Sequence, residues 1–363
     1  PPLLTEQMAD AKIKEAVKAM EAGAKHEKTS LTKWKPDFEA ALHEYERAAV
    51  AFKACKDYVR AAAAYSKAAD ASHRIDAVGN AGRLLELGAQ MLRDGGDMDG
   101  AASMFERSAR MYFEEGTVEK GAEVLCKGAR TLEDSSPERA AQLYLRAAQA
   151  MHDDESRPVE FAAPTFRAAA SFLLRTGRLA DAVRVLEHQL EAHWVLRQPE
   201  AAAKCALAIV VARLCADDFL GALGWLASLE ADASRADVVR QEEARVAREL
   251  LEGFQAQSEE AVAAVVGKRV FNYVDPHAAK LARGMSLRVA GVPVEYVTSR
   301  RAGGITGGAL PPLPPPPPRP LGAEPDHSAG AAVGADIGAR TGSRPLKTGD
   351  FGEVIDDFTD DLT

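Results

Sequence analysis

The sequence has 363 residues, 47% of them hydrophobic and 6% aromatic, and its formal net charge at pH 7 is −9. A chain of this length can bury a large core, but its acidic balance argues against nonspecific binding of nucleic acid, which needs a strongly basic surface. The sequence contains no run of about 18 apolar residues that would span a membrane, and its start lacks the pattern of a secretory signal. We therefore expect a cytoplasmic protein with no nucleic-acid partner.

Residues 5–28 carry apolar residues at helical spacing and predict an amphipathic first helix. The loop that follows contains Leu31, Lys33, Trp34 and Lys35. In one interpretation, the Trp34 ring lies at the headgroup depth of a membrane and the lysines attract anionic lipid. In the other, Trp34 packs back on the first helical hairpin. The residues alone leave both interpretations open.

One pattern of small and large residues recurs nine times between residues 37 and 232. In most copies, a central apolar residue follows a small residue by four positions and precedes a small pair by three and four positions. These positions share one side of an α-helix, where small residues let neighbouring helices approach closely. The central residue recurs at steps of 19 to 22 residues, at Tyr45, Tyr65, Leu85, Phe105, Leu125, Tyr144, Phe166, Leu186 and Cys205.

Each copy of the pattern predicts one helix, and two copies predict an antiparallel hairpin of about 40 residues. Gly, Pro, Asp and Ser fall between the copies, where helices are expected to end. The sequence therefore predicts an all-α, tetratricopeptide-like, right-handed solenoid of helical hairpins. We expect this domain to cover residues 1–290, with less regular helices at 235–252, 256–268 and 275–289.

The position two residues after the central residue points away from the packed side of each helix. In the first six copies it holds Arg47, Lys67, Leu87, Arg107, Lys127 and Arg146, of which five are basic. Because consecutive helices face opposite sides of a two-layer solenoid, these residues divide between two sides. The first side is predicted to hold Lys67, Arg107 and Arg146, with Arg60, Arg74 and Arg110 nearby. The second is predicted to hold Arg47, Lys127 and Arg130.

Two interpretations of these basic positions remain open. They form either a track for an elongated acidic partner or a solvated face that keeps the protein soluble, since arginine stems also cover apolar surface.

The composition changes after Gly291. Residues 291–349 are rich in Gly, Pro and Ala and predict a disordered linker with a polyproline II segment. Within it, Pro314, Pro317 and Arg319 match the pattern of an SH3 ligand, although we favour a stiff spacer because long proline runs often match. Residues 350–363 are acidic and carry apolar residues on one helical face, which predicts a tail that folds on a partner.

The sequence offers no set of residues for catalysis, for a cofactor or for a metal. It lacks a glycine-rich phosphate loop, a His-Glu-x-x-His motif and a nucleophile elbow. His188 and His193 are five positions apart, which places them on different helix faces. The cysteines form no Cys-x-x-Cys pair, and we interpret them as thiols, mostly buried, in a reducing compartment. We therefore expect recognition rather than catalysis.

Several segments together resemble the soluble NSF attachment proteins, and among them the gamma type. The similarity extends over roughly residues 8–290, and the segments follow the order and spacing of that family. They are Leu31–Phe38, Tyr45–Lys53, Met111–Gly116, Ser136–Tyr144, Leu250–Phe254 and Ala279–Leu281.

The resemblance implies a non-catalytic adaptor that binds SNARE complexes of syntaxin-type helices and recruits the AAA+ ATPase NSF, which then disassembles them. It also implies work in vesicle-mediated and ER–Golgi transport and a peripheral association with vesicle and Golgi membranes. The acidic residues that the family presents to the ATPase match Asp217 and Glu252, with Glu259 and Glu260 nearby. The penultimate leucine that the ATPase reads matches Leu362.

The chain also departs from the family. The phenylalanine of the family's membrane loop is replaced around Ser30 and Leu31, so Trp34 is expected to carry more of any lipid contact. Glu123 and Ala163 align with basic positions of alpha-type members. The alternative function is a tetratricopeptide-like scaffold that binds peptide tails and recruits SH3 proteins through its proline run.

Overall fold

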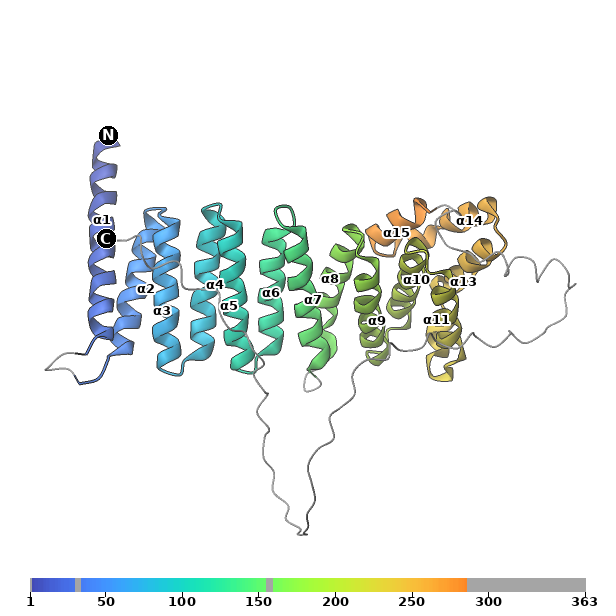
Figure 1. The fold of residues 1–363 in the computed structure, drawn as a ribbon, viewed down its shortest axis with the longest axis horizontal. Helices are drawn as coiled ribbons and strands as arrows, with labels where there is room; N and C mark the ends of the chain where they lie inside the picture. The colour runs from blue at the N-terminus through green and yellow to red at the C-terminus, as the bar shows by residue number, and fades with distance from the viewer. Residues whose placement is uncertain (1, 30–33, 155–158, 286–363) are drawn as a thin grey trace, which may run out of the picture. The chain divides into compact units, whose positions relative to one another are not determined.

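The computed structural model describes residues 2–29, 34–154 and 159–285. These residues belong to one compact unit, 1–306, and they form α-helices joined by turns and short 3-10 helices (Figure 1). The predicted linker and acidic tail lie outside the described residues. So do the individual predicted residues Leu31, Lys33, Pro314, Pro317, Arg319 and Leu362.

The regular part of the unit is a row of helices in which each helix packs mainly on its neighbours in sequence (Figure 1). This arrangement confirms the predicted all-α solenoid of helical hairpins. The helices are α1 (Pro2–Glu27), α2 (Phe38–Ala54), α3 (Tyr58–Arg74), α4 (Val78–Asp94), α5 (Met98–Glu114), α6 (Val118–Leu132), α7 (Pro137–Asp153), α8 (Ala163–Arg175), α9 (Leu179–Val195) and α10 (Pro199–Cys215).

The repeat determines where these helices begin and end. Asp37, Asp57 and Asp97 each precede a helix and accept a hydrogen bond from the backbone N–H three residues ahead, which caps the helix. At the other end, the residue after the C-cap adopts positive φ in turn after turn. This residue is Lys56, Asp76, Gly96, Gly116, Gly177, Arg197, Asp217 or Gln257.

The core is made by the repeated pattern, as predicted. The nine central residues are only 1–5% exposed, and alanines at the flanking small positions, such as Ala41 and Ala48, are fully buried. One close approach requires glycine, because a Cβ added to Gly23 would lie 2.6 Å from Cε1 of the Tyr45 ring. The small residues therefore set the short distance between helices, and the central residues fill the remaining space.

Side-chain ion pairs join helices that are two apart in sequence. Arg83 of α4 pairs with Glu46 of α2, and Arg107 of α5 pairs with Asp70 of α3. Such pairs define an even layer, α2, α4 and α6, and an odd layer, α3, α5 and α7, as expected of a two-layer solenoid. We call this series of ion pairs within each layer the ladder.

The C-terminal part of the unit is less regular than predicted. It contains α11 (Phe219–Ala231), α12 (Ala236–Val239), α13 (Glu242–Gln255), α14 (Glu259–Val266) and α15 (Pro276–Arg283), with 3-10 helices at Val159–Phe161, Ala233–Arg235 and Arg269–Asn272. The single helix predicted over 235–252 is wrong, because the extended backbone of Gln241 separates α12 from α13. No glycine or proline marks this break.

No helix among the described residues is both long enough and apolar enough to cross a membrane.

Candidate partner-binding groove

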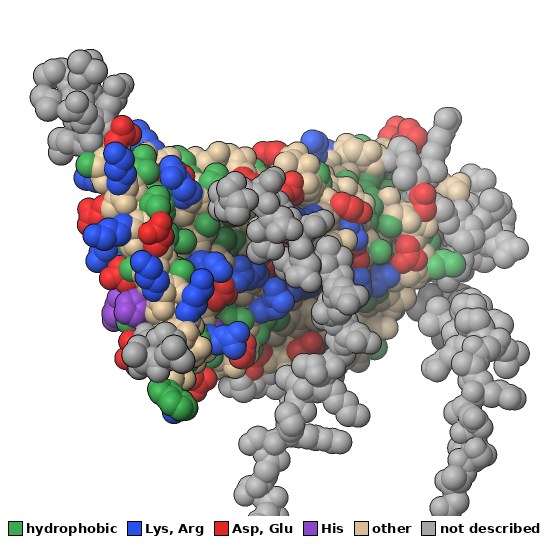
Figure 2. Space-filling model, turned by 60° about the vertical axis from the view of Figure 1, so that its left-hand side comes forward, with side chains coloured by type: hydrophobic (Ala, Val, Ile, Leu, Met, Phe, Trp, Pro, Cys, Tyr) green, Lys and Arg blue, Asp and Glu red, His purple; other side chains and the backbone are tan. Residues whose placement is uncertain are grey.

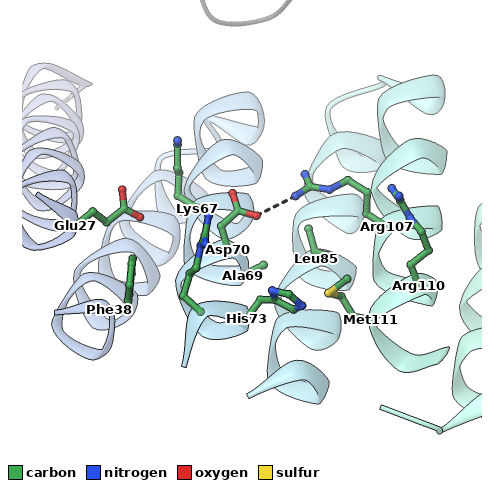
Figure 3. A pocket seen from close by; sticks show the side chains of 11 residues that line it. Glu27, Phe38, Lys67, Ala69, Asp70, His73, Leu85, Arg107, Arg110 and Met111 are labelled. Carbon is green, nitrogen blue, oxygen red and sulfur yellow. Dashed lines mark hydrogen bonds and ion pairs between the residues drawn. The ribbon is translucent and has the colours of Figure 1, made fainter. Parts of the chain in front are cut away.

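A groove with a volume of about 670 Å³ lies between the end of α1 and helices α3 and α5 (Figure 3). Its apolar surface comes from Phe38, Ala69, Leu85 and Met111. Its charged and ionisable residues are Glu27, Lys67, Asp70, His73, Arg74, Arg107 and Arg110. Five of these seven residues are basic residue types, in a protein whose net charge is −9.

The two acidic residues of the groove already have partners. The Arg107 guanidinium donates to Oδ1 of Asp70 at 3.1 Å (Figure 3). It also donates to Oγ of Ser66 at 2.9 Å. The Tyr45 hydroxyl is hydrogen-bonded to Glu27, and burial together with this carboxylate raises the pKa of Tyr45 well above its usual value. Asp70 is therefore neutralised by Arg107, whereas Glu27 accepts a neutral hydroxyl and keeps its negative charge.

Three of the cations in the groove have no acidic partner among the described residues: Lys67, Arg74 and Arg110. His73 is different, because its Nε2 lies 3.0 Å from Oε1 of Glu114. The groove thus combines apolar surface with unneutralised positive charge, a combination that suits an amphipathic acidic ligand.

The even layer carries the same pattern of basic positions but neutralises most of it. Lys127 lies 2.6 Å from Glu86 of α4 and 2.9 Å from Glu123, and Arg47 lies 3.1 Å from Glu44. Burial opposes the charged forms of both partners. The hydrogen bonds between them nevertheless raise the pKa of Lys127 and lower that of Glu123.

The exception in the basic series, Leu87, lines a second groove of about 620 Å³ on the even side. That groove is mainly apolar, with Val50 59% exposed. Arg130 is exposed on the same layer. The two sides of the row therefore differ in chemistry as well as in their residues.

Two further predicted basic residues also form ion pairs. Arg60 pairs with Asp57 at 2.5 Å and lies over the Phe52 ring, outside the groove. Arg146 of α7 lies 2.9 Å from Glu106, which also binds Arg139 at 2.8 Å. Sequence reasoning found the basic residues but not pairs such as Arg146–Glu106 and Lys127–Glu86, because those partners lie about 40 residues apart.

The loop between α1 and α2 presents its tryptophan to solvent. Trp34 is 90% exposed, and Lys35 beside it is also exposed. The interpretation in which Trp34 packs on the first hairpin is therefore wrong. The Asp37 backbone N–H donates to the His26 carbonyl at 2.9 Å, which closes the base of the loop.

The predicted acidic residues gather at one end of the C-terminal helices. α11 runs back along α10 and α13 runs forward again, so α10 and α13 end at the same edge, seen at the top right of Figure 1. Residues from these ends, including Cys215 and Phe254, line a cavity of about 480 Å³ closed by α15. Asp217, Glu252, Glu259 and Glu260 lie within a few residues of these ends and are all exposed.

The sequence did not reveal a stacked pair of imidazoles. The His152 ring of α7 and the His188 ring of α9 have centroids 3.7 Å apart and planes 29° apart. His193 instead faces the core, where its Nδ1 lies 2.8 Å from Oε1 of Gln198. The expectation that His188 and His193 lie on different faces of their helix is confirmed.

Cys126, Cys205 and Cys215 are free thiols, as expected, and of the four cysteines only Cys126 and Cys205 are fully buried. Burial raises the pKa of Cys126 to about 11 and that of Cys205 to about 12. Cys55 and Cys215 are half-buried.

The fold and these surfaces match one family of proteins. The family described as "Soluble NSF attachment protein, SNAP" matches residues 7–274, which is most of this chain. The chain belongs to the SNAP family. Family membership makes it an NSF attachment adaptor.

Two curated relatives indicate the type. The chain is 24% identical to the gamma-soluble NSF attachment protein of Dictyostelium discoideum over 284 residues, 78% of this chain and 86% of the relative. It is 29% identical to the gamma-soluble NSF attachment protein of Arabidopsis thaliana over 188 residues, 52% of this chain and 61% of the relative. The chain is thus similar to gamma-type members, as its sequence motifs indicated.

A solved structure, that of BtubC (BKLC) from P. vanneervenii, aligns with 64% of this chain and 93% of its own, at 17% identity. Its TM-score of 0.33 is too low to carry an argument about this SNAP.

Proposed function

We propose that this SNAP is a non-catalytic adaptor that binds a SNARE helical bundle through its odd layer and presents its C-terminal end to the ATPase NSF. The bundle is an elongated, charged rod of helices, and it would lie across Lys67, Arg107 and Arg146. The observation that carries the proposal is the groove of the odd layer, because its cations are only partly neutralised while those of the even layer are mostly paired.

The positions of Lys67, Arg107 and Arg146 along their helices support a bundle that lies across the helix axes. Lys67 of α3 and Arg107 of α5 are one two-helix repeat apart, so they stand at the same height in parallel helices, and Arg146 follows on α7. Same-layer helices lie close enough for side-chain ion pairs to join them, as His73 and Glu114 do at 3.0 Å. The three residues therefore form a line across the helix axes, which suits a rod-shaped partner better than a small ligand.

The acidic end of the C-terminal helices is the proposed surface for NSF. Asp217, Glu252, Glu259 and Glu260 are exposed at one edge, away from the odd-layer groove. Basic surfaces on a partner ATPase would be attracted to this edge. The proposal adds Leu362 from the C-terminal tail as a further contact.

The experiment is a reconstitution with purified SNARE complexes that lack membrane anchors. We expect the full chain to retain NSF on immobilised SNARE complexes and to stimulate its ATPase. We expect Glu252→Lys and Leu362→Ala to reduce this stimulation without weakening SNARE binding.

The matched control is Glu200→Lys, since Glu200 is exposed at the opposite end of α10 and the change in charge is the same. If stimulation is absent, or if both test variants stimulate like the wild type, the proposal is wrong. Tight binding of short extended peptides without SNARE complexes would instead favour a peptide-binding scaffold.

A further inference from the structure

One pair of positions in the even layer holds two cations instead of a cation and a carboxylate. Alternation along the row places α8 and α10 in this layer. Arg167 of α8 directly follows its central residue, as Glu46 does on α2. Lys204 of α10 follows Arg167 by 37 residues, the same spacing that brings Arg83 to Glu46. Two like charges are therefore spaced as the members of an ion pair are.

Both cations line one cavity of about 320 Å³, which lies between α8, α9 and α10 and the residues that precede α15. Neither Arg167 nor Lys204 has an acidic partner among the described residues. Asp275 contributes a carboxylate to the lining, and its Oδ1 accepts the backbone N–H of His277 at 2.8 Å, which caps α15. Positive charge therefore exceeds negative charge in the described lining of the cavity.

The α9 wall of the cavity is polar at a position where the repeat has small residues. Gln189 lies three positions after the central residue of α9, and in the other eight copies this position holds Ala, Gly or Ser. Gln189 is only 8% exposed, and its amide has no hydrogen-bond partner among the described residues. His193, one turn further along α9, also lines the cavity. A buried amide without a partner costs free energy, and a ligand that hydrogen-bonds to it would remove this cost.

These groups together have the chemistry of a site for a small phosphate monoester. Such an ester carries a charge of about −1.5 to −2 at neutral pH, which matches two neighbouring cations better than a carboxylate does. Arginine binds phosphate oxygens in a bidentate manner, and lysine adds a point charge. The Gln189 amide both donates and accepts, so it suits a hydroxyl group of the ligand. The volume lies at the lower end of the range for small-molecule pockets and favours a small ligand.

We propose that this cavity binds a small hydroxylated phosphate monoester, with its phosphate between Arg167 and Lys204 and a hydroxyl group hydrogen-bonded to Gln189. A bound phosphate would join α8 to α10 as ion pairs join other helices of the ladder. The site shares no residue with the surfaces proposed for the SNARE bundle and for NSF, and its occupancy does not depend on either partner.

The test is isothermal titration calorimetry of the full chain, without SNAREs or NSF, with glycerol 3-phosphate as the probe. Glycerate is the comparison ligand, since it has a carboxylate in place of the phosphate. We expect saturable binding of glycerol 3-phosphate and roughly tenfold weaker binding of glycerate. A short phosphoserine peptide presents the same phosphate chemistry on a polypeptide and should bind more weakly than the probe, because the cavity is small.

Arg167→Gln/Lys204→Gln should weaken binding of the probe by roughly tenfold or more, because it removes both charged contacts. Arg130→Gln/Lys53→Gln is the matched control, since it removes the same two residue types from exposed positions of the even layer. Gln189→Leu should weaken binding but raise the melting temperature of the unliganded chain, because leucine needs no hydrogen-bond partner. A thermal melt by circular dichroism measures this and confirms that each variant is folded.

Absence of saturable binding, equal binding of glycerol 3-phosphate and glycerate, or equal losses in the test and control variants would overturn the proposal. Unchanged binding in Gln189→Leu would also overturn it, because the amide would then contact no ligand. Binding of the phosphoserine peptide as tight as that of glycerol 3-phosphate would overturn it as well, and would assign the two cations to a phosphorylated protein partner.

Discussion

The two layers of the row carry the same sequence pattern but have different surfaces. In the even layer, Lys127 reaches two carboxylates and Arg83 reaches Glu46. In the odd layer, Lys67, Arg74 and Arg110 reach none among the described residues. The layers differ in degree, because Arg107 and Arg146 of the odd layer also pair with carboxylates two helices before them.

Figure 2 shows Lys and Arg side chains gathered at the N-terminal end of the row, among scattered acidic ones. Net charge alone would not indicate this surface, since the whole chain is acidic.

The largest expected effect is on partner binding by the odd layer. Lys67→Glu/Arg107→Gln should weaken SNARE-complex binding by about 3 kcal/mol, on the order of 100-fold, because it removes attraction and adds repulsion on the proposed track. Arg130→Glu/Arg47→Gln makes the same change of charge on the even layer and should cost less than about threefold. Surface plasmon resonance at fixed salt measures both, and equal losses would remove the distinction between the layers.

The next largest effect is on stability. Here the even-layer substitution should cost more than the odd-layer one. Lys127→Ala should lower the free energy of unfolding by about 1–2 kcal/mol, because it leaves the poorly exposed Glu86 carboxylate without its partner. Lys67→Ala should change it by less than about 0.5 kcal/mol. Urea unfolding followed by circular dichroism compares the two, and a larger loss in Lys67→Ala would contradict the assignment.

Acidification should affect the odd side through its imidazole pair. Burial lowers the pKa of His188, and the neighbouring His152 lowers it further, against an opposing effect of Asp153. A depressed native pKa means that the unfolded chain takes up the proton first, so stability is retained above the unfolded pKa of histidine and falls as pH drops below it. The urea concentration at the unfolding midpoint should decrease as the pH is lowered from 7 to 5. His188→Phe should make this decrease smaller. An equal decrease in the variant would show that the imidazole pair is not its cause.

The smallest effect is expected at turns that lie in neither proposed binding surface. Substitutions there serve as a control for changes in either layer. Lys56 and Arg197 have φ of 59° and 57°, at turns equivalent to those of Gly96 and Gly177. Lys56→Gly/Arg197→Gly should raise the free energy of unfolding by about 1 kcal/mol, since glycine adopts this conformation without steric cost. SNARE binding should stay unchanged, and a loss of it would show that these turns belong to a binding surface.

The architecture could be read from the sequence because the repeat is local. Each copy specifies its own helix, its packed side and its turn, and Tyr45, Phe105 and Tyr144 are buried as predicted. The break at Gln241 was missed because no local signal marks it; tertiary packing of Val238, 1% exposed, accompanies it.

The sequence predicted the positions of the basic residues in the candidate site but not their partners. The register gave the positions of Lys67 and Arg107, but their different environments depend on Asp70, a residue of the neighbouring odd helix. The exposure of Trp34 and the stacking of His152 on His188 also depend on how distant segments meet. Side-chain length and rotamer decide such contacts, and a single sequence does not specify them.

The ladder also has a mechanical consequence. Its ion pairs bridge alternate helices across each layer's outer surface, so stretching the row lengthens these bridges while the buried alanine contacts act as the pivot. Exposed charge pairs weaken as the Debye length shortens. We therefore expect higher ionic strength to weaken these bridges and to make the row easier to bend.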